Sequence, residues 1–121
     1  MGKSILVVED YPETLGLFKA VLEGEGYTVK AVETGEQTLE VLSVNSYDLV
    51  ILDIMLPRID GFEVCKRIKA DPKTKNVPVV AVTAFDVPDI LKRCNAVGVD
   101  EVVIKPFDPN NLVSVIKKYV P

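Results

Sequence analysis

The chain contains no histidine, which removes every mechanism that needs an imidazole base or a phosphohistidine on this protein. It has only two cysteines, Cys65 and Cys94, which lie far apart and form no CxxC pair. Without histidine or paired cysteines, a zinc site is not indicated. Both cysteines fall on expected helices among apolar neighbours, where we expect reduced thiols that serve packing.

Long hydrophobic runs and long basic runs are also missing. The longest apolar stretches, such as residues 49–52, are too short to cross a bilayer, and the first residues lack the apolar core of a signal peptide. A net charge of −4, from 14 Lys and Arg against 18 Asp and Glu, disfavours nucleic-acid binding. We therefore expect a cytoplasmic protein with no direct nucleic-acid or membrane partner.

What the sequence does contain is a regular alternation of strand-like and helical segments. The strand-like segments are rich in Val, Ile and Leu and mostly continuous, which is typical of strands covered on both faces. We expect them at residues 4–8, 28–32, 48–53, 77–82 and 101–104. With five intervening or following helices, the pattern predicts an α/β fold with a doubly wound, five-stranded parallel sheet. The 121 residues suit one domain, residues 1–121.

Local patterns mark where the helices begin. Residues 34–37 form a capping box, and Asp60 leads a similar pattern. Asp86 with Pro88, and Asp108 with Pro109, indicate two further helix starts.

Polar residues follow four of the expected strands. Glu9 and Asp10 follow the first, Asp53 ends the third, and Thr83 and Lys105 follow the fourth and fifth. In an open parallel sheet the ligand crevice lies beyond the carboxyl ends of the strands, so these side chains should converge. Carboxylates, a hydroxyl and a lysine are suited to holding a divalent metal and a phosphoryl group.

Most of these residues also have a simpler explanation when taken singly. Glu9 and Asp10 could cap the first helix, Thr83 could be an ordinary strand-end hydroxyl, and Lys105 could be a solvated surface lysine. Asp53 has few such explanations, because an unpaired charge at the end of a buried strand is costly. Their joint occurrence at four strand ends favours the functional interpretation.

In order and spacing, these residues resemble the receiver domain of two-component response regulators. Met55-Leu56-Pro57 and Asp60-Gly61 also resemble the family's segment after its acceptor aspartate, and the similarity covers essentially the whole chain. The resemblance implies the flavodoxin-like strand order 2-1-3-4-5, which chemotaxis receivers exemplify. In that order Asp10 and Thr83 flank Asp53, while Lys105, two strands away, could reach back on its long stem.

The resemblance also implies a role for each residue. Asp53 is the expected phosphoacceptor of a two-component or phosphorelay system, and Thr83 and Lys105 contact the transferred group. The expected Mg²⁺ ligands are Glu9, Asp10, Asp53 and the carbonyl of Met55. The expected phosphoryl donor is a histidine kinase or histidine phosphotransfer protein, and the expected target contacts the fourth helix, fifth strand and fifth helix. Because nothing follows the last expected helix, we expect no output domain and no enzymatic activity beyond the protein's own phosphorylation and dephosphorylation.

Other function classes fit less well. A nucleotide or flavin module would need small residues after the first strand, where this chain has Glu9-Asp10-Tyr11-Pro12. A Mg²⁺-dependent aspartyl-phosphate phosphatase of the haloacid dehalogenase type would need a DxD pattern there. A degenerate receiver acting as a scaffold remains a further alternative, against which the complete acidic set argues. One departure from the family is Val102, at a position usually aromatic, so we expect the signal to depend on residues 83–85 and the following helix.

Overall fold

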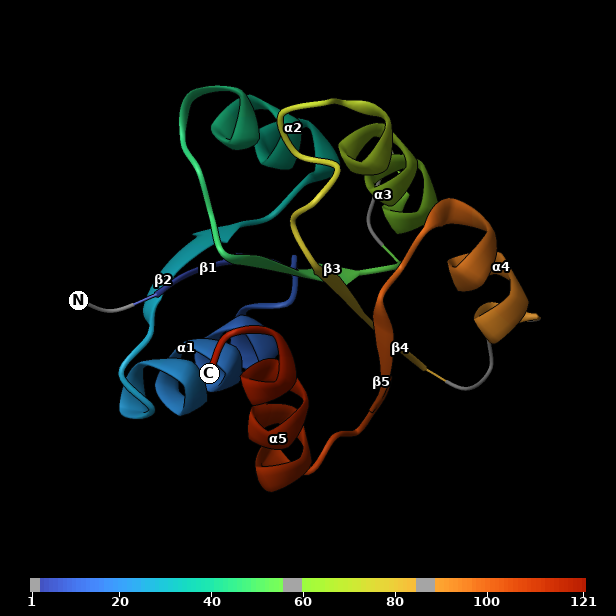
Figure 1. Cartoon of the computed structure of the whole chain (residues 1–121). Coiled ribbons are helices and arrows are strands. Elements are labelled where there is room, and N and C mark those ends of the chain that lie inside the picture. The colour runs from blue at the N-terminus through green and yellow to red at the C-terminus, as the bar shows by residue number, and fades with distance from the viewer. Residues whose placement is uncertain (1–2, 56–59, 85–88) are drawn as a thin grey trace.

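The computed structural model describes residues 3–55, 60–84 and 89–121. Its parallel sheet has the order β2-β1-β3-β4-β5. The strands are β1 (Ser4–Val8), β2 (Thr28–Val32), β3 (Leu49–Asp53), β4 (Val79–Ala84) and β5 (Glu101–Lys105). The helices are α1 (Pro12–Gly24), α2 (Gly35–Val44), α3 (Gly61–Ala70), α4 (Ile90–Val97) and α5 (Pro109–Tyr119). The predicted fold class and strand order are confirmed (Figure 1).

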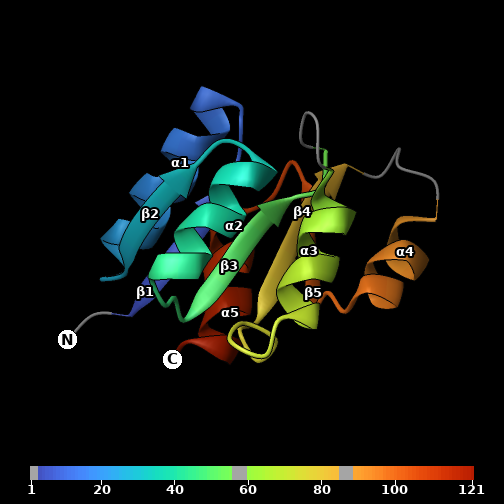
Figure 2. The same ribbon diagram turned by 90° about the horizontal axis from the view of Figure 1, so that it is seen from above.

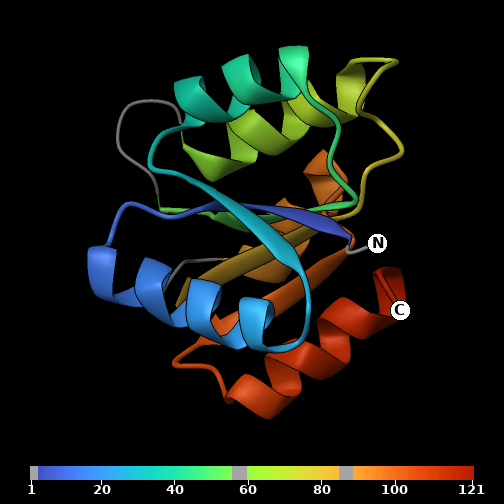
Figure 3. The same cartoon turned by 90° about the vertical axis from the view of Figure 1, so that its left-hand side faces the viewer.

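The helices cover both faces of the sheet. Figure 3 shows α1 and α5 on one face and α2 and α3 on the other, and α4 packs beside α3. A large apolar core fills the α1–α5 side, and includes Phe18, Leu22 and Ile116. A second core lies beneath α2 and α3, around Leu52, Val64 and Ile68. All five residues of β3 are buried, as expected for a central strand covered on both faces.

A third, smaller cluster lies beneath α4. It consists of Ile54, Phe62, Ala81, Ile90 and Cys94. Arg93 of α4 also stacks over the ring of Phe62, 4.0 Å from its centroid, so α4 is held to α3 by both apolar and cation–π contacts. The half-buried Val102 of β5 packs against this α4 cluster.

Three of the predicted helix starts are confirmed by capping bonds. The side chains of Thr34, Asp60 and Asp108 accept hydrogen bonds from backbone N–H groups of the first turns of α2, α3 and α5. The fourth, at Asp86 and Pro88, lies outside the described residues. Among the described residues, α4 is preceded by Asp89, which has a left-handed φ of 53° and makes no side-chain cap.

The predicted bounds of β4 were wrong by two residues. The strand spans Val79–Ala84 rather than residues 77–82. It begins at Val79, whose N–H donates to the Asp100 carboxylate at 2.8 Å, just after Pro78, which has no N–H to give. It continues through Thr83 and Ala84 because these residues pair with Ile104 and Lys105 of β5.

Both cysteines are buried, as expected of packing residues, and they form no disulfide with each other. Burial raises the pKa of the Cys65 thiol to about 11, so this thiol is a weak nucleophile at neutral pH. Within the described ranges, no helix is both long enough and apolar enough to cross a membrane.

Candidate functional site

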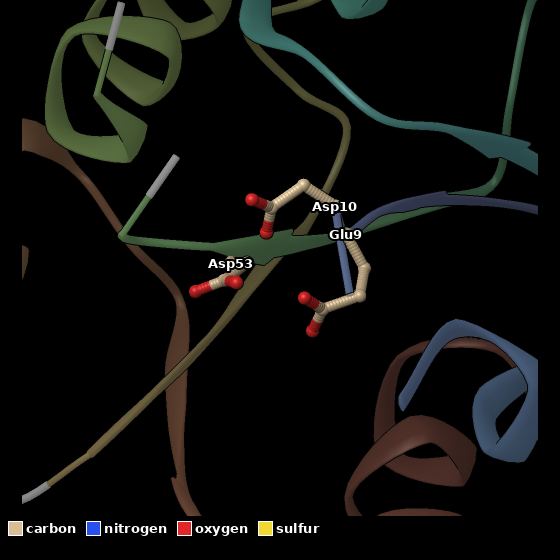
Figure 4. Close-up of side chains that lie close together, drawn as sticks. All are labelled: Glu9, Asp10 and Asp53. Carbon is tan, nitrogen blue, oxygen red and sulfur yellow. The ribbon is translucent and has the colours of Figure 1, made fainter. Parts of the chain in front are cut away.

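Three carboxylates meet at the carboxyl edge of the sheet. Glu9 and Asp10 follow β1, and Asp53 is the last residue of the adjacent strand β3. One oxygen from each carboxylate lies within 4.8 Å of the other two. Figure 4 shows the three side chains converging from these two neighbouring strands. We call this group the acidic cluster.

The members of the acidic cluster differ in their exposure to solvent. Glu9 is 1% exposed and Asp53 is 5% exposed, whereas Asp10 lies open to solvent. Two carboxylates about 4 Å apart repel by roughly 4 kcal/mol at an effective dielectric near 20, and burial adds a desolvation cost. The acidic cluster therefore favours any cation that can reach it.

Lys105 supplies one such cation from β5, two strands away from β3 in the sheet. Its Nζ lies 3.1 Å from Glu9 Oε1 and 3.4 Å from Asp53 Oδ2. Lys105 ends β5, which is separated from β3 by β4, so its long stem spans two strand positions. The predicted reach of this lysine is confirmed, but its closer contact with Glu9 was not anticipated.

The pKa values of Glu9 and Lys105 show that one lysine does not fully balance the charge of the acidic cluster. Burial first, and then the neighbouring Asp53, raises the pKa of Glu9 to about 7. Burial acts to lower the pKa of Lys105, but its hydrogen bond to Glu9 and the charge of Asp53 outweigh that effect and raise it. A single lysine thus holds its own proton firmly and still leaves Glu9 prone to protonation.

Neighbouring residues fix the position of Asp53. The Oδ1 atom of Asp53 accepts a hydrogen bond of 3.0 Å from the N–H of Met55, and this bond aims the carboxylate toward the edge of the sheet. At Gly61, a Cβ would lie 2.5 Å from the Cα of Ile54 and 2.7 Å from the carbonyl oxygen of Asp53. Only glycine allows α3 to begin this close to Asp53. The sequence indicates Asp60-Gly61 as a helix start and as part of a family motif, but it does not reveal this contact.

Thr83 completes the residues that the structure brings to this edge. Asp53 pairs with Val82 of β4, so the next residue, Thr83, lies just beyond it at the crevice. Its buried hydroxyl donates a 3.4 Å hydrogen bond to the carbonyl of Ala84, a distance at which such a bond is weak. The hydroxyl can therefore exchange this partner for a stronger acceptor at low cost.

The predicted segments on either side of the site lie partly outside the described residues. Met55 is described, and its side chain is exposed. Leu56, Pro57 and Phe85 fall in the ranges 56–59 and 85–88, which the structure does not describe.

The donor chemistry of the site fits a hard divalent cation. The acidic cluster offers carboxylate oxygens only, and Mg²⁺ prefers oxygen ligands and commonly keeps several waters. The exposed Asp10 leaves one side of the cluster open to solvent, from which such waters and a phosphate group could approach. The residues present therefore suit a magnesium ion.

Fold and site together define a doubly wound α/β domain with a crevice at its carboxyl edge whose carboxylates attract cations. The response regulator receiver domain model matches residues 5–117, and the chain belongs to this family. Receiver domains interact with histidine kinases or phosphotransfer proteins, and the family generally binds Mg²⁺.

Individual relatives agree with this assignment. The chain is 32% identical over 120 residues to the polar-differentiation response regulator DivK of Brucella ovis, covering 99% of this chain and 98% of DivK. A putative response regulator from Chloroflexus aurantiacus superposes with a TM-score of 0.94 at 32% identity, covering 98% of each chain. The receiver domain of the Pseudomonas aeruginosa sensor histidine kinase PA1611, solved with a coordinated magnesium ion, gives 0.91 at 29% identity, again covering 98% of each chain.

Proposed function

We propose that this protein is a cytoplasmic, Mg²⁺-dependent phosphoacceptor switch that is phosphorylated on Asp53. The observation that carries the proposal is the contact of Lys105 with both Glu9 and Asp53 across two strands. A lysine held against an acceptor carboxylate can neutralise the charge that a phosphoryl group brings to that position.

In the proposed reaction, an oxygen of the Asp53 carboxylate attacks phosphorus of a phosphohistidine on a histidine kinase or phosphotransfer protein. The new O–P bond gives an acyl phosphate, and the P–N bond breaks with its electrons returning to the imidazole. Magnesium held by Glu9, Asp10, Asp53 and the Met55 carbonyl would supply charge neutralisation for the phosphoryl oxygens. The chain catalyses only its own phosphorylation and dephosphorylation, which distinguishes it from an aspartyl-phosphate phosphatase.

In this proposal, Lys105 and Thr83 then couple the phosphoryl group on Asp53 to the rest of the molecule. Phosphorylation gives Lys105 a phosphoryl oxygen in place of the carboxylate oxygens that it contacts at 3.1 and 3.4 Å. The Thr83 hydroxyl, weakly engaged with Ala84, turns to the same group. Lys105 ends β5 and Thr83 is the penultimate residue of β4, and both strands lie beside the α4 cluster, so their movement acts on the packing of α4.

The output surface in this proposal is the face formed by α4, β5 and α5. Leu91 of α4 is an apolar side chain 63% exposed on this face. Val102 of β5 stands where the family usually has an aromatic residue, so the output would depend on α4 and on residues 83–85. A downstream protein would then distinguish the phosphorylated state by the position of α4.

The direct test is phosphorylation by acetyl phosphate with Mg²⁺, followed by intact mass spectrometry. We expect one phosphoryl adduct on the wild type, none on Asp53→Asn, and strong suppression by EDTA. Asp71→Asn is the matched control, because Asp71 is an exposed carboxylate whose bond to the Lys73 N–H an asparagine oxygen can keep. Stoichiometric labelling of Asp53→Asn would contradict the assignment.

A further inference from the structure

A second hollowed surface lies at the opposite edge of the sheet from the acidic cluster. A hollow of about 130 Å³ opens among the end of α2, residues 45–47 and the connection between α3 and β4. A neighbouring hollow of about 150 Å³ lies between α2 and α3, and shares Leu42, Ser43 and Thr74 with the first. In Figure 2 the α3–β4 connection lies at the end of the sheet away from the carboxyl end of β3. We call the joined hollows the α2–α3 groove.

The lining of the α2–α3 groove combines apolar with polar and charged side chains. Leu42 is buried at its base, and Leu39 and Val77 line it as half-buried side chains. Val44, the last residue of α2, is 76% exposed at its rim. An exposed branched apolar side chain beside a hollow gains stability when a partner covers it.

The same edge concentrates positive charge. Five of the 14 cations lie between residues 66 and 75, a stretch that holds one carboxylate, Asp71, although the whole chain carries −4. The five are Lys66, Arg67, Lys69, Lys73 and Lys75. Of these five, Arg67 and Lys73 line the groove, and the exposed Lys75 directly follows the lining residue Thr74.

Only part of this charge is balanced within the chain. Arg67 pairs with Glu63 at 2.9 Å, and Lys69 pairs with Asp100 at 2.9 Å. In the part of the chain that the structure describes, no ion pair joins Lys66, Lys73 or Lys75 to a carboxylate. Lys73 Nζ reaches across the groove to the carbonyl of Ser43 at a long 3.5 Å, a contact that a carboxylate would readily replace.

We propose that the α2–α3 groove docks an acidic protein segment, which places an apolar side chain in the hollow and carboxylates against Lys73 and Lys75. The charge of the two lysines and the apolar part of the lining each match one half of such a segment. The hollows are smaller than the 300 Å³ or more that small-molecule sites commonly have, so they accept single side chains. A nucleic acid would use the charge but not the apolar lining, and the acidic remainder of the chain opposes it.

The position of the groove gives the docking a specific consequence. A strand of five residues is roughly 16 Å long, so a segment in the groove leaves the acidic cluster uncovered. A partner held there could therefore remain bound while Asp53 exchanges phosphoryl groups at the other end of the sheet.

The test selects a phage-displayed library of random 12-residue peptides against the purified wild-type protein. We expect enriched peptides to carry net negative charge together with one or two large apolar residues. The best peptide should bind a Lys73→Glu, Lys75→Glu double variant about tenfold more weakly in fluorescence anisotropy, as two lost surface ion pairs and the reversed charges imply. The double variant Lys19→Glu, Lys30→Glu is the control, because it changes charge equally at exposed lysines elsewhere and should retain binding.

The apolar half of the proposal is tested by Val44→Ser, which should also weaken the peptide, and by NMR shifts, which should fall in residues 39–47 and 66–77. Equal loss in both double variants would reduce the effect to general electrostatics and overturn the proposal. Failure to enrich acidic peptides would overturn it too, as would tighter binding of a 16-base-pair duplex DNA. Self-association of the wild type that the Lys73 and Lys75 changes abolish would overturn it as well, because the groove would then belong to a second copy of this chain.

Discussion

Lys105 neutralises carboxylates that reach it from two other strands, and its removal should expose how unfavourable the acidic cluster is. With Lys105→Met, Glu9 and Asp53 lose their shared cation in a largely buried setting. We expect a loss of about 1–2 kcal/mol in the free energy of unfolding without metal, because Glu9 can limit the cost by taking up a proton. Added Mg²⁺ should restore more stability to this variant than it adds to the wild type. Urea unfolding with and without Mg²⁺ measures both effects.

Lys117→Met is the control for that experiment. Lys117 pairs with Glu25 at 3.1 Å, but both side chains are well exposed, so we expect a change within about 0.5 kcal/mol and no special response to Mg²⁺. Equal behaviour of the two variants would mean that Lys105 is a surface lysine like any other.

Gly61 determines whether α3 can begin close to the end of β3. Gly61→Ala would place a Cβ 2.5 Å from the Cα of Ile54, and backbone cannot move aside as a flexible side chain can. We expect a loss of about 2–3 kcal/mol in the free energy of unfolding. Gly16→Ala, in α1 with nothing within 4 Å of its Cβ, should instead gain about 0.5–1 kcal/mol. A matched pair of urea titrations checks the opposite signs, and a harmless Gly61→Ala would contradict the crowding seen here.

At the residue scale, the sequence identified which side chains gather at the site but not how they divide their contacts. Strand-end position was enough to select Glu9, Asp53 and Lys105, because parallel strands bring their carboxyl ends together. It could not show that Lys105 lies closer to Glu9 than to Asp53, since that depends on side-chain packing. The crowding at Gly61 was equally invisible, because it arises between segments whose approach only the folded chain defines.

At the scale of elements, β5 and α5 are joined by a hydrogen bond whose donor, the Tyr119 hydroxyl, is titratable. The hydroxyl of Tyr119 lies 2.9 Å from Glu101 Oε1 and 3.1 Å from the carbonyl of Asp100. Burial first, and then the bond to Glu101, raises the pKa of Tyr119 to about 12 from its ordinary value of 10. Because the folded state holds the proton more tightly, this contribution is complete below pH 10 and is lost as the pH rises toward 12.

Tyr119→Phe should therefore lose part of the pH dependence of stability. Compared with the wild type, we expect a lower free energy of unfolding at pH 8 and a smaller further decline between pH 10 and pH 11. Urea unfolding at these pH values is the measurement, and differences between variants cancel the titration of the lysines. The exposed Tyr11→Phe should follow the wild-type curve, and identical curves for all three proteins would remove the argument.

Element bounds were predictable where local chemistry determines them and less so where partners do. Thr34, Asp60 and Asp108 marked helix starts correctly, because a capping side chain acts within its own first turn. The bounds of β4 were misplaced because its start depends on Asp100 and its end on pairing with β5. Both partners are distant in the chain, so residues 77–84 alone could not reveal them.

At the scale of the whole molecule, the switch should act mainly through α4. This helix has eight residues, begins after an uncapped Asp89 with φ 53°, and rests on the small α4 cluster. Ile54 of that cluster directly follows Asp53. A bound phosphoryl group shifts a two-state protein only by its differential affinity for the two states, and α4 rests on the smallest of the three apolar clusters described above.

Beryllofluoride, a phosphoryl mimic, allows this to be measured by NMR. With Mg²⁺ present, we expect shifts of the acidic cluster and Thr83, and further shifts across residues 90–105. Residues 12–44 should change little, because α1 and α2 pack on the larger cores. Shifts confined to the residues that touch the ligand would show that no such switch exists in this chain.

Burial of the functional side chains at the strand ends also affects how such a protein can diverge in evolution. Glu9, Asp53 and Thr83 are buried at the carboxyl edge of the sheet, and none of the three belongs to a helix. Substitutions on the outer faces of the helices can therefore change which proteins recognise the molecule without altering the reaction it undergoes. Duplicated copies within one cell could keep identical chemistry and still be told apart, which is what insulated parallel signalling routes require.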